Sequence, residues 1–209
     1  LVGCWTCTSP AYDILNKKVM MFKDSWCMSI KDVLLEGKTY KLLKLHNICN
    51  VATCIAFHDI IHPTVKFHEA KWTCRNEAVT PHTLHCLVLN IVGEKLTDFE
   101  SSCQLVQSVH DALLAHKDAY EIAKILHWDL SIGNIVIYQG KGILIDWDLA
   151  KVLTIQVCSF YAHTHCTDFA VSKGTWQFMS AHLIKNIKAI HAVKDDLKSS
   201  LYIVLWMAL

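Results

Sequence analysis

Three oxygen-bearing side chains lie near one short pair of apolar runs. Asp129 and Asn134 precede the run Ile135–Tyr138, and Asp146 follows a second run at residues 143–145. Two short apolar runs joined by a glycine-containing turn predict a β-hairpin, which would bring the three side chains together at one end. Carboxylate and amide oxygens suit Mg²⁺, which takes few protein ligands and leaves positions for phosphate oxygens. The pattern therefore predicts a magnesium site.

Elements on both sides of the hairpin would position these side chains. Strands are predicted at residues 19–22, 50–61 and 83–92, and helices at residues 29–46, 101–126 and 192–209. The helix at 101–126 would run directly into the segment that carries Asp129, with His110 and His116 on its surface. Residues 192–209 begin polar and become wholly apolar, which predicts a buried helix.

Several motifs in this region resemble those of protein kinases. His127-Trp128-Asp129, followed by Asn134, is similar to the catalytic loop, and Asp146-Trp147-Asp148 is similar to the metal-binding motif that follows it. The strings DLSIGNI, LIDWDLA, GTWQFMS and DDL most resemble the fungal-type protein kinase family. The resemblance extends from about Gly3 to the C-terminus.

This resemblance implies an α+β, bilobal protein kinase-like fold. A small antiparallel β lobe with one helix would bind nucleotide and occupy residues 1–92. A mainly helical catalytic lobe would occupy residues 93–209. The chain begins with Leu and stops after the helix that would be the central post of this lobe, so we expect a fold truncated at the C-terminus.

The resemblance also implies individual roles in an ATP- and Mg²⁺-dependent phosphotransferase. Asp129 would accept or orient the proton of the attacking hydroxyl group. Asn134 and Asp146 would hold Mg²⁺ against the phosphates. Lys23 would bind the α- and β-phosphates, and Glu36 would pair with Lys23.

Other positions would complete the nucleotide site. Gly3 lies in the turn that would cover the phosphates, and backbone groups near Asn90 and Val92 would hydrogen-bond the adenine. Thr175 resembles the threonine that contacts the catalytic Asp, and Asp196 resembles the Asp that holds the catalytic-loop backbone. Three residues would therefore support the catalytic loop: His127, Thr175 and Asp196.

Three positions depart from the usual kinase pattern. Trp5 replaces the second glycine of the phosphate-covering turn, where a side chain hinders close approach of backbone N–H groups to phosphate. Trp128 stands where many kinases carry an Arg that binds a phosphate on the activation segment, so phosphorylation should not activate the chain by that route. Ser131 stands where Ser/Thr protein kinases usually carry Lys, which favours small-molecule phosphotransferases, whereas Thr175 favours Ser/Thr protein kinases.

Composition narrows the class of partner. A formal net charge of +1 over 209 residues provides no basic surplus for nucleic acid, and the apolar stretch 201–209 is too short to span a membrane. Ten cysteines in a chain of this length favour an intracellular protein with free thiols, cytoplasmic or nuclear, over a secreted disulfide scaffold. One cluster has residue types that could in principle bind zinc, and it consists of Cys158, His163, His165 and Cys166. The simpler interpretation is that these are loop residues without a function.

Three functions remain open. The first is a kinase domain that transfers the ATP γ-phosphate to Ser or Thr of a protein substrate. The second is a pseudokinase, a binding module without turnover, which Trp5, Trp128 and the early C-terminus favour. The third is a small-molecule phosphotransferase, which Ser131 supports.

Overall fold

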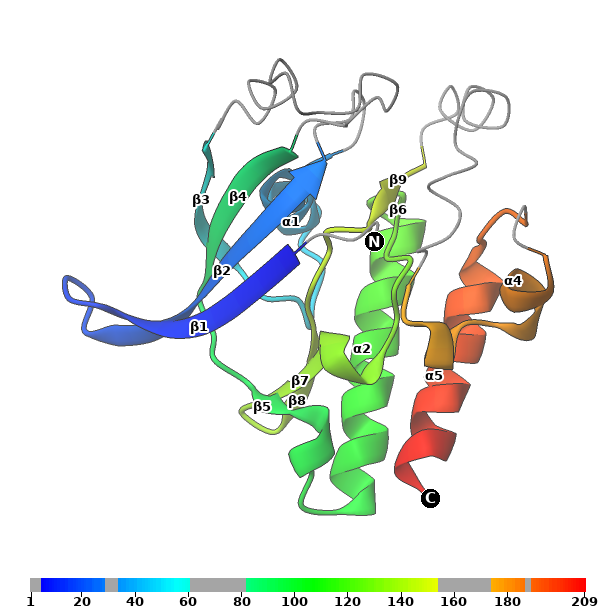
Figure 1. Cartoon of the computed structure of the whole chain (residues 1–209). Helices are drawn as coiled ribbons and strands as arrows, with labels where there is room; N and C mark the ends of the chain where they lie inside the picture. The colour runs from blue at the N-terminus through cyan, green and yellow to red at the C-terminus, as the bar shows by residue number, and fades with distance from the viewer. Residues whose placement is uncertain (1–4, 29–33, 61–81, 154–173, 187–188) are drawn as a thin grey trace, which may run out of the picture.

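The computed structural model describes residues 5–28, 34–60, 82–153, 174–186 and 189–209. Antiparallel sheets and four helices make up these residues, an architecture compatible with a kinase-like fold (Figure 1). In chain order the elements are β1 (Trp5–Asp13), β2 (Lys18–Met28), α1 (Glu36–Leu45), β3 (Cys54–Ile60), β4 (His82–Leu89), β5 (Glu94–Lys95), the 3₁₀ turn η2 (Leu96–Asp98), α2 (Ser102–Glu121), β6 (Ile125–Leu126), η3 (Ile132–Asn134), β7 (Ile135–Tyr138), β8 (Lys141–Leu144), β9 (Lys151–Val152), η5 (Trp176–Phe178), α4 (Ala181–Lys185) and α5 (Val193–Met207).

The N-terminal strands form one antiparallel sheet in the order β1-β2-β4-β3. Strand β2 is central, and its Lys23 lies in register with Thr8 on one side and Leu87 on the other. The predicted strand ended at Lys23, but β2 continues to Met28. Because both neighbouring strands pair along this length, the ladder of hydrogen bonds extends the strand beyond its apolar part.

Helix α1 packs on this sheet and is shorter than predicted. It begins at Glu36, and residues 34 and 35 are not helical. Tyr40 of α1 is buried in the same core as Leu87 of β4. Gly37 allows this close approach, because a Cβ atom there would overlap the ring of Phe57. The start of α1 is therefore held directly against the sheet.

The predicted hairpin is confirmed as β7 and β8, which pair in register from Ile135 with Leu144 to Tyr138 with Lys141. It lies against α2 at Gly142, where a Cβ atom would overlap the backbone of Ser108. The amide of Gly142 donates to a carboxylate oxygen of Asp111 on α2 at 3.1 Å.

Helix α2 ends earlier than predicted. The expected helix reached residue 126, but α2 ends at Glu121 and Lys124 adopts a left-handed backbone with φ 58°. Ile125 and Leu126 then pair with β9 as strand β6. A left-handed residue cannot continue an α-helix, so the chain turns here into the segment that carries Asp129.

Helix α5 runs beside α2 (Figure 1). The prediction of a buried helix holds for one face of α5 only: Ile203 is fully buried, whereas Leu201, Leu205 and Trp206 are each more than half exposed. The buried face of its first turns is instead polar and includes Asp195 and Asp196. None of the helices that the structure describes is long and apolar enough to cross a membrane.

Candidate functional site

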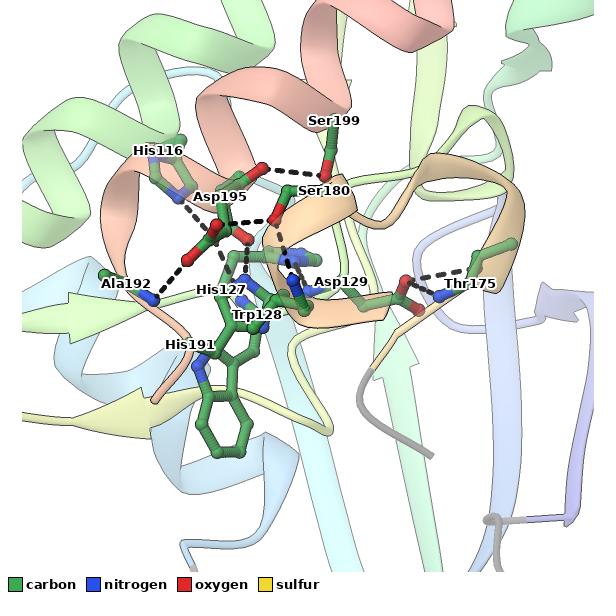
Figure 2. Close-up of polar contacts among 12 residues, drawn as sticks. His116, His127, Trp128, Asp129, Thr175, Ser180, His191, Ala192, Asp195 and Ser199 are labelled. Atoms are coloured by element: carbon green, nitrogen blue, oxygen red, sulfur yellow. Dashed lines mark hydrogen bonds and ion pairs between the residues drawn. The ribbon is translucent and has the colours of Figure 1, made fainter. Parts of the chain in front are cut away.

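The carboxylate of Asp129 is surrounded by hydrogen-bond donors. Its Oδ1 accepts from the backbone amide of Thr175 at 2.7 Å and from the Thr175 hydroxyl at 3.0 Å. Its Oδ2 accepts from Nδ2 of Asn134 at 3.1 Å, and the same Nδ2 donates to the backbone carbonyl of Asp129 at 2.7 Å. In Figure 2 the side chains of Asp129 and Thr175 point toward each other. Two residues, the nearby Asn134 and the distant Thr175, therefore fix the orientation of one carboxylate.

The ring of His127 supports the loop that carries Asp129. It is fully buried, its Nε2 donates to the carbonyl of Ile145 at 3.0 Å, and its Nδ1 accepts from the amide of Asp129 at 3.3 Å. Burial lowers the pKa of His127, in agreement with a neutral ring that donates at one nitrogen and accepts at the other. His127 thus ties the loop before Asp129 to Ile145, the residue between β8 and Asp146.

Lys23 joins β2, α1 and the segment after β8. Its Nζ lies 2.7 Å from Oε2 of Glu36 and 2.7 Å from Oδ1 of Asp146. The other oxygen of Glu36 accepts from the amide of Trp147 at 3.1 Å. Burial alone would lower the pKa of Lys23, but the carboxylates of Glu36 and Asp146 raise it, so the lysine stays charged.

The charges around Lys23 do not balance. Asp148 also lies near the lysine. Its pKa is raised first by burial and then by the negative charge of Asp146. Burial likewise raises the pKa of Glu36 to about 7, against the attraction of Lys23. Burial also opposes ionisation of Asp146, yet Lys23 lowers its pKa overall. One buried ammonium therefore lies among three carboxyl groups, of which Glu36 and Asp148 hold protons more readily than in water, and an additional cation would favour their ionised forms.

This concentration of carboxyl groups fits Mg²⁺ at Asp146. Because Nδ2 of Asn134 donates to Asp129, Oδ1 of that amide is left as the acceptor end of the side chain. Within the described residues, no group of three or more His, Cys, Asp or Glu side chains could hold a metal by itself. An ion here would therefore need water and phosphate oxygens as well, which is the way Mg²⁺ is usually bound.

Two non-glycine residues at the site have left-handed backbones. The φ angle is 74° at Trp128 and 63° at Asp146. Such conformations are costly for residues with a Cβ atom and persist only where surrounding contacts impose them. The backbone conformation of Trp128 is held by its amide, which donates to Oδ2 of Asp196 at 3.2 Å. That of Asp146 is held by the ion pair of its side chain with Lys23.

Asp196 is a fully buried carboxylate between two histidines. Nε2 of His116 on α2 lies 2.8 Å from its Oδ2, and Nε2 of His191 lies 2.5 Å from its Oδ1. Burial opposes the charge, but hydrogen bonds from the two histidines lower the pKa of Asp196. The prediction that His116 lies on the surface is wrong. Its spacing of seven residues from buried Val109 was the signal that placed it on the inner face of α2.

The lowered pKa of Asp196 predicts a pH dependence of stability. A carboxylate with a depressed pKa in the fold stabilises it above the unfolded-state pKa of about 3.9, and this contribution is lost as pH falls toward the folded-state value. We therefore expect the difference in unfolding free energy between the wild type and Asp196→Asn to be constant above about pH 5 and to shrink below about pH 4. Urea denaturation from pH 3 to pH 7 measures it. A difference that grows on acidification would contradict the pairing.

A fourth buried histidine, His85, holds the start of α1. Nε2 of His85 on β4 accepts from the amide of Gly37 at 3.1 Å, and its Nδ1 lies 2.5 Å from Asp59. The N-cap residue Leu35 provides no side-chain cap, so His85 satisfies one of the free N–H groups of the first turn. Single-sequence patterns did not reveal this role, because the partners lie on different elements.

We expect His85→Leu to lower the free energy of unfolding by about 1–3 kcal/mol, the cost of a buried donor left without a partner. Urea denaturation at pH 7 measures the loss. His58→Leu is the matched control, because His58 lies exposed on β3. Equal stability of the two variants would exclude the capping role of His85.

The remaining predicted site residues are placed as follows. Asn90 follows β4. Its backbone amide donates to the backbone carbonyl of Thr53 at 2.9 Å, and its side-chain Oδ1 accepts from the backbone amide of Thr53 at 2.8 Å. The Asn90 amide is thus engaged with Thr53, and Val92 lies half-buried two residues on. Gly3 and the candidate zinc cluster at residues 158–166 lie outside the described residues.

Comparison with known proteins identifies the family. No curated protein matches the chain. The family model described as fungal protein kinase matches residues 63–208, which include the Asp129 loop, the Asp146 motif, Thr175 and Asp196. Lys23 and Glu36 precede the matched range and are joined to it by the contacts of Lys23 with Asp146. With most of its length matched, the chain belongs to the fungal protein kinase family.

Proposed function

We propose that the chain transfers the γ-phosphate of ATP to Ser or Thr hydroxyl groups of proteins, with Mg²⁺ at Asp146 and Asn134. Membership of a protein kinase family implies kinase chemistry on protein substrates. The single observation that supports turnover is the orientation of Asp129, whose carboxylate is held by Thr175 and Asn134. A module that only binds nucleotide has no need of such an arrangement.

The acceptor count at Asp129 supports a role in proton transfer. A carboxylate offers about four acceptor positions. Thr175 fills two on Oδ1 and Asn134 fills one on Oδ2, which leaves a position on Oδ2 for the proton of an incoming hydroxyl group. Asp129 would orient that hydroxyl and accept its proton as phosphoryl transfer proceeds.

The other residues would position the nucleotide. Lys23 would bind phosphate oxygens, and Glu36 would keep its ammonium group in place through their 2.7 Å contact. Asp146 and the amide oxygen of Asn134 would hold Mg²⁺, which neutralises charge on the β- and γ-phosphates. Residues 1–92 would form the nucleotide-binding part and residues 93–209 the catalytic part, a division that stays a prediction.

The deciding experiment is transfer of labelled γ-phosphate to a protein substrate with and without Mg²⁺, followed by identification of the phosphorylated residue. We expect Mg²⁺-dependent label on Ser or Thr, and none with Asp146→Asn. Thermal shift by ATP is measured on the same samples. A nucleotide-dependent shift without transfer would indicate a binding module, and transfer only to small alcohols would indicate a small-molecule phosphotransferase. Either outcome would overturn the proposal.

A further inference from the structure

The indole of Trp128 contacts side chains from two separate segments. Nζ of Lys151, on β9, lies 3.6 Å from the centre of a Trp128 ring, within the range of a cation–π interaction. The imidazole of His191, just before α5, stacks on Trp128 with ring centres 5.5 Å apart and an interplanar angle of 27°. Trp128 itself is only 8% exposed. We call these three side chains the Trp128 stack.

The Trp128 stack is anchored on Asp196. Nε2 of His191 donates to Oδ1 of that carboxylate, while Oδ2 accepts from the amide of Trp128 itself. One buried carboxylate thus holds both the backbone of Trp128 and the His191 ring that packs on its side chain. His191 therefore uses Nε2 to bind Asp196, and among the described residues its Nδ1 has no hydrogen-bond partner.

Lys151 reaches this stack because β9 pairs with β6. Lys151 lies opposite Leu126, two residues before Trp128. The strand that follows the Asp146 motif is therefore tied to the catalytic loop twice, by strand pairing and by the contact of Lys151 with the indole. Asp129, the next residue after Trp128, receives the hydrogen bonds from Thr175. A shift of Trp128 would displace the carboxylate that the reaction needs.

We propose that Lys151 and His191 are positioning residues: by holding the Trp128 indole from β9 and from the start of α5, they keep Asp129 beside Thr175 without a phosphate group on the chain. This inference rests on the proposed function. An Arg at position 128 would need an anion to neutralise it in this buried place. The indole needs none, because it carries no charge, and the side chains of Lys151 and His191 pack against it.

The first test is a set of substitutions at Lys151. We expect Lys151→Met to lower kcat about 2–30-fold, the range of a partly to fully desolvated cation–π contact, with KM for ATP unchanged. Lys151→Arg keeps a cation over the ring and should recover most of the rate. Lys185→Met, at an exposed lysine of α4, is the matched control and should equal the wild type. Equal rates for Lys151→Met and the wild type would overturn the proposal.

The second test separates positioning from general destabilisation. In a Trp128→Leu background, Lys151→Met should have no further effect on kcat, because its ring partner is already gone. His191→Leu should lower kcat, and His191→Gln, which keeps a donor for Asp196 but no ring, should recover only part of it. Independent, multiplying effects of the Lys151 and Trp128 substitutions would contradict the stack.

The third test concerns phosphate. Phosphatase-treated protein, shown by mass spectrometry to carry no phosphate, should retain the full rate, and a loss of rate would overturn the proposal. If the wild type transfers no phosphate at all, the proposed function fails and the positioning role with it. In that case the free energy of unfolding tests whether Lys151 and Trp128 interact, through the coupling of Lys151→Met with Trp128→Leu. Coupling without phosphate transfer would mean that only the proposed function fails, and no coupling would mean that the Trp128 stack fails as well.

Discussion

Asp129→Asn is expected to slow γ-phosphate transfer by about 10²–10⁴-fold, the usual contribution of a positioned acid–base group. The amide cannot take the proton of the attacking hydroxyl. Its carbonyl oxygen can still accept from Thr175, so the loop keeps one side of its hydrogen bonding. Initial rates at saturating ATP and Mg²⁺ measure the loss. KM for ATP should change little, because the contacts of Lys23 with Glu36 and Asp146, which would position the phosphates, do not involve Asp129.

The control for this prediction is Asp98→Asn, which neutralises an exposed carboxylate of η2. The control should transfer phosphate at the wild-type rate, and both variants should show similar cooperative unfolding in urea. A rate for Asp129→Asn within threefold of the control would contradict the role of Asp129 in proton transfer. The same result would leave the family assignment and the nucleotide contacts intact.

Local patterns predicted the parts of the site that are close in sequence. Two apolar runs and the glycine-containing turn between them predicted the hairpin, and β7 has the predicted bounds, whereas β8 spans Lys141–Leu144 instead of residues 143–145. The family motifs led us to expect contacts of Asp129 with Thr175 and of Asp196 with the catalytic-loop backbone, and the structure contains both. These contacts recur wherever the same motifs fold in the same way, so one sequence sufficed to expect them.

Long-range polar partners could not be predicted in this way. His116 and Asp196 are 80 residues apart, and the ring of His191 reaches Trp128 from a different segment. A single histidine has the same appearance in the sequence whether it lies in water or between buried groups. The end of α2 was missed for a related reason, because pairing of Leu126 with Lys151 overrides the helical preference of the residues before it.

Lys23→Met is expected to lower the free energy of unfolding by about 3–5 kcal/mol, because it leaves buried carboxylates without their cation. Lys23 is 3% exposed and lies 2.7 Å from both Glu36 and Asp146. Burial already raises the pKa of Glu36 to about 7, and loss of the lysine raises it further. An acid whose pKa is higher in the fold than in the unfolded chain destabilises the fold as pH rises.

Because the pKa of Glu36 is already about 7 with the lysine present, the part of this loss that comes from Glu36 should appear as the pH rises through and above 7. Urea denaturation at pH 5 and pH 8 measures this difference. The double variant Lys23→Met with Glu36→Gln removes one of the stranded charges, so it should be more stable than Lys23→Met at pH 8. Neither variant should gain stability from ATP and Mg²⁺, since both lack the ammonium group that would bind phosphate. A loss that is equal at both pH values, or a double variant no more stable than the single one, would show that the charge of Glu36 does not depend on Lys23 in the folded protein.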